Sequence, residues 1–492
     1  MALESLLGLE TILVLLFTYA LYNVIDRTLM SPLRSVPGPW YCAISAIFYK
    51  RHTKKGTQLE WIQGLHEIYG PVVRIAPRTV NVCDVDAAYI IHSSHKFVKG
   101  QSYAAFNFTG VPNIFSTSDP DVAKTRRKLV LPMFTRSAIN EMDEMVMLAG
   151  IRPLLLLLEK RAESGSTADL YKLFHYMTFN VIGDIVFGRN FGLLKDGTSS
   201  DNMITWMNGM RILHARVCAQ RTGVQLYAIC MLTSSITRPD ACSWSASKQA
   251  IRIRRSTENP RADSLQRYLT AMEEEKVERM TDAEIAGDML MQLSAGSGTT
   301  AKCLTWTIYL LSRTPDVRAR LLQELQEAVP DNGTEIRHAM VRDLPYLNAV
   351  IDESLRVYPV GSGGAPRVVP KGGVELCGKY VPGGTTVLAR QYLINHSKEI
   401  WKDPATFRPE RWLTQDSVHL EKMRRAFFPF SMGVRACVGR ELAKMEIRVV
   451  VATLVRRFNI EVLPENDMTP ICSVTVLPRG GSLVSRLTKR TE

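Results

Sequence analysis

The chain has 492 residues, of which 46% are hydrophobic and 22% are charged, and its formal net charge is +13. This composition is typical of a globular protein, and no repeat or low-complexity tract interrupts it, so we predict one large folded body. Lysine and arginine are spread along the chain, which disfavours nucleic acid as a partner. Attraction to an acidic protein partner or to an anionic lipid surface explains the positive net charge equally well.

The cysteine pattern indicates a reducing compartment. The chain contains nine cysteines, an odd number, and no two of them form a C-x-x-C pair. A disulfide framework or a zinc cluster is therefore not expected.

The first 26 residues are predicted to form a membrane anchor. The run from Leu3 to Ile25 is largely apolar and exceeds the roughly 20 residues that a helix needs to span a bilayer, although Glu10 interrupts it. A cleaved signal peptide is the alternative, but the N-terminus has no basic residue and no A-x-A pattern follows. Basic residues begin at Arg27, which predicts a single-pass protein of the endoplasmic reticulum membrane with its body in the cytoplasm.

Residues 27–40 are predicted to form a hinge between the anchor and the body. Pro32 and the sequence Pro37-Gly38-Pro39 fix backbone angles and remove hydrogen-bond donors. They indicate a stiff extended arm, and an ordinary irregular loop is the alternative.

The body, residues 41–492, begins with a predicted helix over 57–69 and two paired strands over 71–75 and 79–82. Residues 100–120 follow as a loop rich in phenylalanine and branched apolar side chains. Such a loop can line a ligand pocket or simply cover a core.

A basic helix is predicted over residues 121–134, with Arg126, Arg127 and Lys128 in succession. A run of charge on a helix is usually a solvated face. Two helical segments follow over 154–187, and residues 201–235 read as further apolar helices.

A long helix is predicted to begin at the capping box Thr281-Asp282-Ala283-Glu284 and to continue to Arg313. At 1.5 Å per residue it is a rod of roughly 48 Å, long enough to cross the whole body. Gly296 and Gly298 each cost about 1 kcal/mol inside a helix, so they need a compensating reason. Either small residues let a flat ligand approach the backbone, with Thr299 pointing its hydroxyl into a cavity, or they serve helix packing.

A shorter helix over residues 344–358 places Glu353 and Arg356 three positions apart, where the two side chains can pair. Exposed pairs of this kind contribute little to stability. Strands are predicted after it at residues 368–369, 385–388 and 472–476.

The sequence Phe430-Ser431-Met432-Gly433-Val434-Arg435-Ala436-Cys437-Val438-Gly439 reads as a loop that delivers one cysteine to the start of a helix. The helix dipole and the nearby arginine should favour the thiolate, and the phenylalanine can shield the sulfur from water. The two glycines permit tight turns and a ligand lying against bare backbone. A shielded thiolate suits a soft or borderline metal such as haem iron. A buried cysteine between two glycines is the alternative.

This loop resembles the haem-binding loop of the cytochrome P450 family, F-x-x-G-x-R-x-C-x-G, at every fixed position. Residues 295–300 resemble the family's A-G-x-[D/E]-T-T motif, and residues 353–356 its E-x-x-R motif. The resemblance covers the chain from Pro37 to its end and is strongest to membrane-bound fungal enzymes that oxidise specialised metabolites. It implies a mainly α fold with small β-sheets and a long central helix over haem b.

The resemblance also implies roles for individual residues. Cys437 would be the axial ligand of the haem iron, and Thr299 would guide protons. Three arginines would bind the haem propionates, namely Arg435, Arg367 and Arg127. Four small or aromatic residues would lie against the haem, namely Phe430, Gly433, Gly439 and Ala295. A buried scaffold network would join Glu353, Arg356 and Arg411.

Two positions depart from the family pattern. Gly298 occupies the usual acidic position, so Thr299 must work through water or a group elsewhere. Ala123 stands where His or Trp is common, which removes one propionate donor.

The resemblance implies a monooxygenase that inserts one oxygen atom from O₂ into a hydrophobic terpenoid or polyketide-derived intermediate. Residues 201–235 would be a lid over the substrate channel, and Gly361 to Ala365 would leave room for a bulky substrate. The predicted pocket residues are Phe106, Phe115, Ser362 and Val474.

Electrons would come from NADPH through a flavoprotein reductase, with cytochrome b5 as a second candidate partner. The reductase would dock on a basic face that includes Arg126, Lys128, Arg424 and Lys444. Two alternatives remain open: a haem-thiolate isomerase or dehydratase, and a non-catalytic haem-binding protein.

Overall fold

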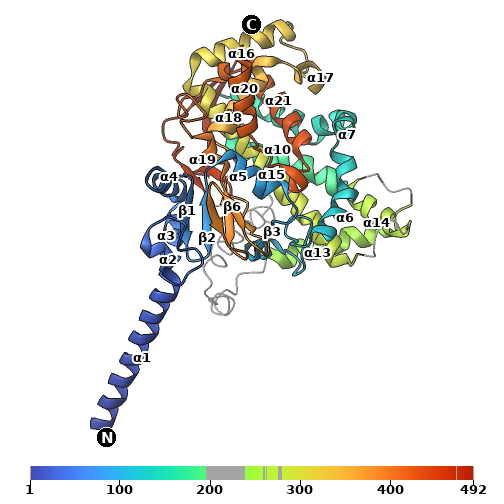
Figure 1. The fold of residues 1–492 in the computed structure, drawn as a ribbon. Helices are drawn as coiled ribbons and strands as arrows, with labels where there is room; N and C mark the ends of the chain where they lie inside the picture. Colours follow the sequence, from blue (N-terminus) through green and yellow to red (C-terminus); the bar gives the residue numbers. More distant parts are fainter. Residues whose placement is uncertain are drawn as a thin grey trace. The chain divides into compact units, whose positions relative to one another are not determined.

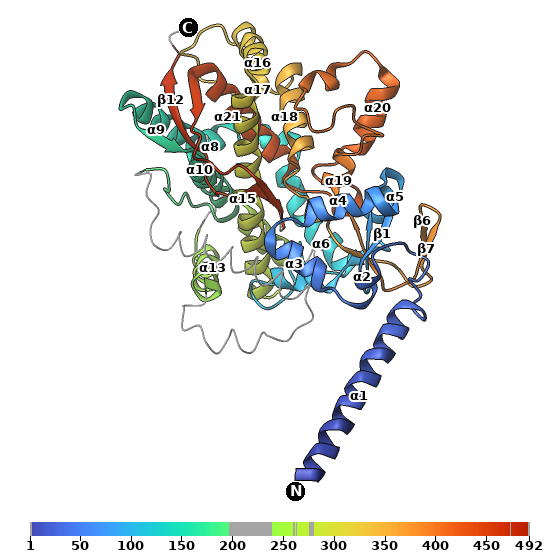
Figure 2. The same cartoon turned by 90° about the vertical axis from the view of Figure 1, so that its left-hand side faces the viewer.

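A computed structural model describes residues 2–195, 239–258, 261, 263–274, 280–472 and 474–490. Over these residues the fold is mainly helical with small sheets, as predicted (Figures 1 and 2). The helices predicted over residues 201–235 lie outside the described residues. The contacts divide the chain into two compact units, a smaller one of Met1–Gly100 and Gly364–Arg390 and a larger one of Gln101–Gly363 and Gln391–Glu492.

The smaller unit is built on a five-stranded sheet with the order β1-β2-β8-β5-β3. Its helices are α1 (Ala2–Thr28), α2 (Trp40–Ile44), α3 (Ile47–Lys55), α4 (Gln58–Tyr69) and α5 (Val85–Ser93). Its strands are β1 (Val72–Ala76), β2 (Thr79–Val82), β3 (Val98–Lys99), β5 (Arg367–Val368), β6 (Val374–Leu376), β7 (Lys379–Val381) and β8 (Thr386–Ala389). The predicted helix at 57–69 and the antiparallel pair β1–β2 are confirmed.

The helix α1 extends away from the sheet of its own unit (Figure 1). Its side chains from Ile12 to Phe17 are exposed. Among the described residues, no helix combines the length and the apolarity needed to cross a membrane. The predicted membrane anchor over residues 1–26 is therefore not supported.

The predicted stiff arm after α1 is a set of packed turns. Val36 donates its backbone N–H to Leu33, and both side chains are buried. Pro37 accepts the N–H of Arg74 in β1, and Gly38 has a φ of 156° where a Cβ would lie 2.5 Å from the Arg74 oxygen. The segment is thus held against the sheet through its backbone. A glycine is required at this close approach.

The larger unit contains most of the helices. They are α6 (Pro120–Val130), α7 (Arg136–Glu141), α8 (Asp143–Val146), α9 (Arg152–Glu163), α10 (Leu170–Phe187), α13 (Pro239–Arg255), α14 (Ser264–Glu273), α15 (Asp282–Arg313), α16 (Pro315–Ala328), α17 (His338–Val341), α18 (Pro345–Val357), α19 (Gln391–Asn395), α20 (Ser417–Ala426) and α21 (Arg440–Arg457). Short 3₁₀ or π turns are η1 (Gln101–Phe106), η2 (Leu131–Phe134), η3 (Met147–Ile151), η4 (Pro409–Leu413) and η5 (Gly433–Arg435).

Its strands form a sheet of order β4-β12-β9 and a separate hairpin β10–β11. They are β4 (Thr167–Asp169), β9 (Phe458–Val462), β10 (Pro470–Cys472), β11 (Val476–Pro478) and β12 (Val484–Lys489). The strand predicted over residues 472–476 is wrong, because Cys472 and Val476 pair with each other across a turn.

The long helix α15 is the central element of the larger unit. Its capping box is present as predicted, with the Thr281 side chain accepting from the Glu284 backbone and the Glu284 carboxylate accepting from Thr281. The helix packs against α10, α18 and α21 (Figure 2). A Cβ at Gly296 would lie 2.7 Å from Ile182 of α10, so helix packing is the reason for this glycine.

Candidate functional site

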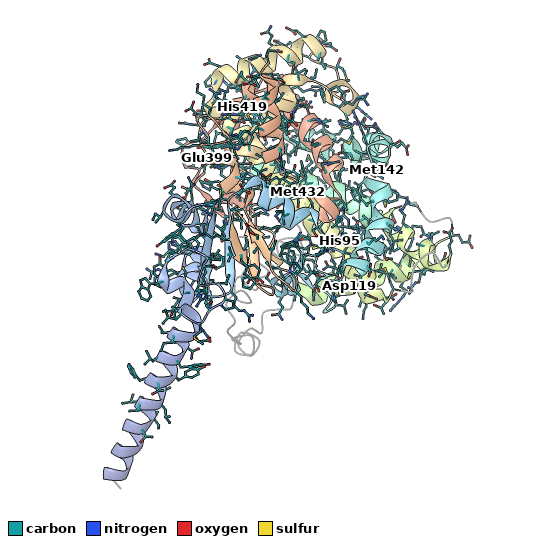
Figure 3. The ribbon with its side chains drawn as sticks, in the orientation of Figure 1. His95, Asp119, Met142, Glu399, His419 and Met432 are labelled. Atoms are coloured by element: carbon teal, nitrogen blue, oxygen red, sulfur yellow. The ribbon has the colours of Figure 1, made fainter. Side chains whose placement is uncertain are left out.

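The cysteine loop joins α20 to α21 in the larger unit, and Met432 of this loop is labelled in Figure 3. Gly433 has a φ of 65° and begins the 3₁₀ turn η5. The backbone N–H of Cys437 donates to the Phe430 carbonyl at 2.8 Å, which closes the loop just before α21. Gly439 has a negative φ and no atom within 4 Å of its Cβ position, so open space rather than a strained turn explains this glycine.

The electrostatics of the thiol differ from the prediction. Burial raises the pKa of the Cys437 thiol, although the Gly439 N–H and the cations Arg127 and Arg440 act in the opposite direction. The expected easy ionisation is therefore wrong for the protein alone, because loss of hydration outweighs the favourable groups. Cys437 nevertheless remains an exposed residue, so a metal can reach it.

Two of the arginines predicted to bind propionates, Arg127 and Arg435, donate hydrogen bonds to backbone carbonyl groups at the site. Arg127 of α6 donates to the Ala436 carbonyl at 2.9 Å, which ties this helix to the cysteine loop. Arg435 donates to the carbonyls of Ile114, Phe115 and Thr117 at 3.2 to 3.3 Å. It thereby anchors the phenylalanine-rich loop to the cysteine loop.

Arg367, the third predicted propionate arginine, belongs to the smaller unit. It is buried at the start of β5, where its guanidinium donates to the carbonyls of Ala365 and Pro366. Its role toward a haem stays a prediction.

The middle of α15 presents one open face. Ala295 and Thr299 are exposed, whereas Ser297, Thr300 and Ala301 are buried. Because positions four apart lie on the same side of a helix, the two exposed residues share a face. The Thr299 hydroxyl donates to the Ala295 carbonyl at 2.7 Å. The helix is continuous through these residues, so Thr299 does not interrupt it.

The structure brings together the three residues that were predicted to form a buried network. Glu353 is fully buried and accepts from Arg356 Nε and Nη2 and from Arg411 Nε, each at 2.9 Å. It also accepts from Trp412 Nε1 and from the backbone of Arg408, both at 3.0 Å. The carboxylate thus receives five hydrogen bonds and two neighbouring positive charges. The indole donor is a partner that the motif alone does not reveal.

The predicted pocket residues lie in different surroundings. The partly exposed rings of Phe106 and Phe115 pack edge to face with centroids 5.1 Å apart. Ser362 is fully buried and donates its hydroxyl to the Pro359 carbonyl. Val474 lies in the turn between β10 and β11, where its carbonyl would be 2.5 Å from a Cβ at Gly363.

Arg126 is not part of a docking face. Its side chain is buried and forms ion pairs with Glu284 at 2.6 Å and with Asp288 at 3.1 Å. Asp288 also accepts from Tyr268 Oη at 3.0 Å and from the Ile114 N–H at 2.5 Å. Asp119, labelled in Figure 3, caps α6 and fixes the direction of this helix.

This buried network was missed because its members come from α6, α14 and α15, far apart in sequence. Burial raises the pKa of Asp288 to about 6, with Arg126 opposing. A charged residue in the middle of a buried helical stretch was the available signal.

The other predicted docking cations remain at the surface or partly exposed. Lys128 and Arg424 are exposed, and Lys444 is partly exposed. Lys444 and Arg424, together with Arg448, act electrostatically on Asp352, so these cations from α20 and α21 gather on one side.

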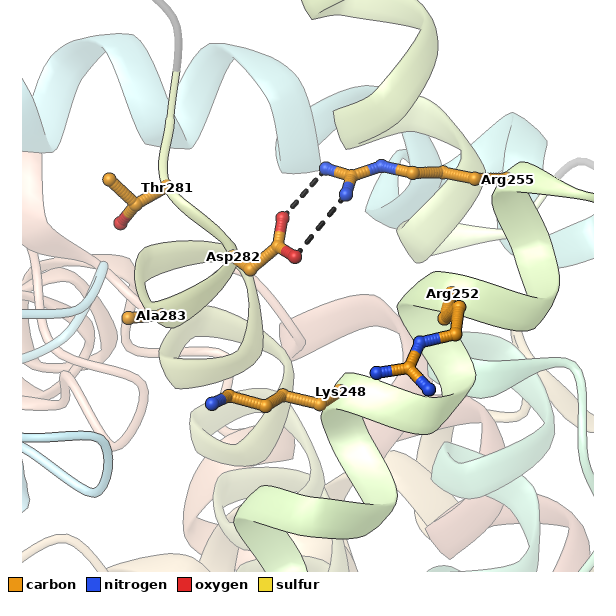
Figure 4. A pocket seen from close by; sticks show the side chains of 6 residues that line it. All are labelled: Lys248, Arg252, Arg255, Thr281, Asp282 and Ala283. Atoms are coloured by element: carbon orange, nitrogen blue, oxygen red, sulfur yellow. Dashed lines mark hydrogen bonds and ion pairs between the residues drawn. The ribbon is translucent and has the colours of Figure 1, made fainter.

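A separate hollow lies between α13 and the start of α15 (Figure 4). It is lined by Lys248, Arg252, Arg255 and residues 281–283, and Arg255 pairs with Asp282 at 2.7 Å. This hollow shares no residue with the cysteine loop or with the open face of α15. We therefore place the candidate functional site at the cysteine loop and at the open face of α15.

Comparison with known proteins decides the family. The cytochrome P450 family model matches residues 35–484. The chain belongs to the cytochrome P450 family. It is 30% identical to cytochrome P450 monooxygenase orf2 of Aspergillus niger over 89% of this chain and 88% of that protein. It is 31% identical to cytochrome P450 monooxygenase traB of Penicillium crustosum over 92% and 90% of the two chains.

The solved structures agree on the fold of this P450. A crystal structure of a cytochrome P450 superposes with a TM-score of 0.74 at 21% identity, covering 88% of this chain and 94% of that one. The crystal structure of the cytochrome P450DA heme domain superposes with a TM-score of 0.75 at 19% identity, covering 88% of this chain and 93% of that one. Another relative, tryprostatin B 6-hydroxylase of Neosartorya fischeri, is 30% identical over 94% of this chain and 82% of that protein.

The protein is thus a cytochrome P450 monooxygenase. The family implies haem and O₂, and the residues present fit a haem. Cys437 is an exposed residue beside the open space at Gly439, and Arg127 places a cation at the same loop. Ala295 offers a small, exposed surface on α15.

Proposed function

We propose that this P450 inserts one oxygen atom from O₂ into a hydrophobic secondary-metabolite intermediate, using electrons that an NADPH-dependent flavoprotein reductase supplies. Hydroxylation, epoxidation and multistep oxidation all belong to this chemistry. The observation that carries the proposal is the cysteine loop, which presents one reachable sulfur at the start of a helix that packs on α15. The localisation in the endoplasmic reticulum membrane stays a prediction.

Haem b, when bound, would supply the oxygen chemistry that no protein side chain performs. Cys437 would hold the iron as a thiolate. The Gly439 N–H, Arg127 and Arg440 favour that anion, and iron provides the further stabilisation that overcomes the loss of hydration. Arg127 and Arg435 sit at the loop as candidate partners for the propionates.

Thr299 would carry protons on the open face of α15. Its hydroxyl donates to Ala295, so the lone pairs of its oxygen are left to accept a hydrogen bond. A proton arriving at this oxygen allows the hydroxyl to pass its own proton onward. For this step the hydroxyl turns away from the Ala295 carbonyl, while the helix backbone keeps its conformation.

The substrate would be an apolar, bulky molecule such as a terpenoid or polyketide-derived polycycle. The edge-to-face rings of Phe106 and Phe115 support this, because an aromatic surface favours apolar contact. Arg435 anchors the backbone of this loop, so the pocket wall and the iron ligand would be held by one side chain.

The reductase would dock on a basic face formed by Lys128, Arg424 and Lys444, with Arg126 excluded because it is buried. Cytochrome b5 is a second candidate for the same face. Charge reversal of Lys444 to Glu should slow NADPH-driven reduction at low salt, with the difference shrinking as salt screens the charges. An unchanged rate at low salt would remove this face from the proposal.

The central test uses purified holoprotein with a reductase. The reduced protein should give the carbon monoxide absorption band of thiolate-ligated haem, and Cys437→Ser should lose it. NADPH and O₂ consumption coupled to product formation separates a monooxygenase from an isomerase, a dehydratase or a haem-binding carrier.

Replacing Thr299 by Val should lower the coupling of O₂ reduction to product by a factor on the order of 10²–10⁴ if it carries the proton step. The matched control is Thr305→Val, because the Thr305 hydroxyl makes the same i−4 bond to Ala301 at 2.8 Å but is fully buried. Equal effects of the two substitutions would contradict the proton role.

A further inference from the structure

Gly298 leaves room for at least a Cβ atom in the middle of α15. A Cβ built at this glycine would meet only two groups within 4 Å, the amine of Lys302 at 3.4 Å and Nε2 of His175 at 3.9 Å. Unlike Gly296, this glycine is not explained by close helix packing. The space is bounded by two nitrogen atoms instead.

His175 presents a hydrogen-bond acceptor to this space. Its Nδ1 lies 2.8 Å from the Tyr171 carbonyl, and since a carbonyl only accepts, Nδ1 carries the hydrogen. Burial and the charge of Lys302 lower the pKa of His175 to about 3, so the ring is neutral near pH 7. Its Nε2 therefore offers a lone pair.

Lys302 presents a donor. Among the residues that the structure describes, it has no hydrogen bond and no ion pair. Lys302 is only partly exposed, and a cation with reduced hydration and no partner is costly, so its presence calls for a reason. Burial lowers the pKa of Lys302 to about 8, so the amine is largely protonated near pH 7 and gives up its proton more readily than an exposed lysine.

The other ionisable groups close to this part of α15 face different atoms. Glu446 of α21 bonds Thr300, and Asp352 of α18 acts on Cys303. His175 of α10 is thus the titratable group that faces the amine from a packed helix.

Lys302 shares the open face of α15. Residues three and four apart are neighbours on a helix surface, and Lys302 follows Thr299 by three and Gly298 by four positions. Gly298 and Lys302 are both partly exposed, as expected for residues beside the exposed Ala295 and Thr299.

We propose that the space over Gly298 holds a water molecule through which Lys302 delivers protons to Thr299, with His175 orienting that water. This inference rests on the proposed oxygen-reducing function, whose electrons come from the reductase. In the step, an N–H bond of the ammonium breaks and an O–H bond forms on the water, which gives another proton to the Thr299 oxygen. The Thr299 hydroxyl gives up its bond to the Ala295 carbonyl and releases its own proton to the oxygen being reduced, and the neutral amine recovers a proton from solvent.

The test compares holoenzyme variants with NADPH and reductase, without added substrate, by the fraction of consumed NADPH recovered as H₂O₂. In wild type this fraction should be low at pH 7 and rise through pH about 8, as the amine loses its proton. Lys302→Met should give a high, pH-independent fraction, with the water-forming path reduced on the order of 10²-fold. Lys172→Met, an exposed lysine of α10, is the control and should behave as wild type.

Two further variants separate proton delivery from a structural role. Lys302→Arg keeps the charge but cannot release a proton near neutral pH, so it should resemble Lys302→Met. Gly298→Asp placed in Lys302→Met should restore a low peroxide fraction, because its Cβ fits the space and its carboxyl group can carry protons. A Lys302→Arg protein with the wild-type fraction and pH profile would overturn the relay.

Thermal unfolding gives a readout that does not depend on turnover. The Lys302 amine loses its proton near pH 8 in the folded protein and near pH 10.5 in the unfolded chain, so unfolding takes up a proton between these pH values. Wild type should therefore gain stability relative to Lys302→Met from pH 8 to 10, and parallel curves would refute the buried, unpaired state. A wild type that consumes no NADPH refutes the proposed function and the relay together. A wild type that turns over, with unchanged Lys302 variants, refutes the relay alone.

Discussion

Replacing Glu353 with glutamine tests whether the buried network around this carboxylate is a structural scaffold. The carboxylate is fully buried and accepts five hydrogen bonds, three of them from the guanidinium groups of Arg356 and Arg411. Glutamine has nearly the same shape, but it is neutral and turns one acceptor oxygen into an NH₂ donor. The new NH₂ group would face the guanidinium and indole N–H groups that now donate to the carboxylate.

The expected cost follows from what the substitution leaves behind. Arg356 and Arg411 are buried, and each would keep its positive charge without the carboxylate. Breaking a buried ion pair by removing one partner costs roughly 3–5 kcal/mol. The remaining bonds of Arg356 to the carbonyls of Asn395 and Pro404 reduce but do not remove this cost. Since the stability of a protein is about 5–15 kcal/mol, the loss should be large.

The assay is urea denaturation of the holoprotein together with haem content and the carbon monoxide spectrum. Glu353→Gln should lower the free energy of unfolding by about 3–5 kcal/mol, or give protein that does not retain haem. The control is Glu461→Gln, because Glu461 pairs with Arg486 at 3.0 Å with both side chains about half exposed. That change should cost less than about 1 kcal/mol. A Glu353 variant with full haem and near-native stability would refute the scaffold role.

Two further predictions concern the larger unit. Gly363→Ala should lower the free energy of unfolding by about 1–3 kcal/mol in urea denaturation, because its Cβ would lie 2.5 Å from the Val474 carbonyl oxygen. The control is Gly361→Ala, whose Cβ would lie 3.7 Å from the Pro429 carbonyl oxygen and which should be near neutral. Equal losses of stability in the two variants would contradict the clash. The pKa of Asp288 is raised from 3.8 to about 6, so between these pH values the folded protein holds a proton on this carboxyl group that the unfolded chain has lost. In denaturation experiments at different pH, wild type should therefore lose stability relative to Asp288→Asn as the pH rises from about 4 to 6. A stability difference that does not change with pH would refute the raised pKa.

Local sequence patterns were enough for several features of this protein. The capping box at Thr281 and Glu284 defines the start of α15 through contacts within one turn. The i, i+3 spacing brings Glu353 to Arg356, and residues 430–439 form a closed loop that ends at the start of α21, as their sequence predicts. In each case the interacting groups lie within ten residues, so the chain's own geometry places them.

Tertiary structure decided what surrounds each charged group. From the sequence, Arg126 reads as a helical cation that faces water. Packing instead pairs Arg126 with Asp288 across 162 positions of the chain and leaves Lys302 beside the space at Gly298. Burial likewise reverses the expected direction of the Cys437 pKa shift. Desolvation and ion pairing depend on neighbours that distant segments supply, and no local pattern records which segments meet.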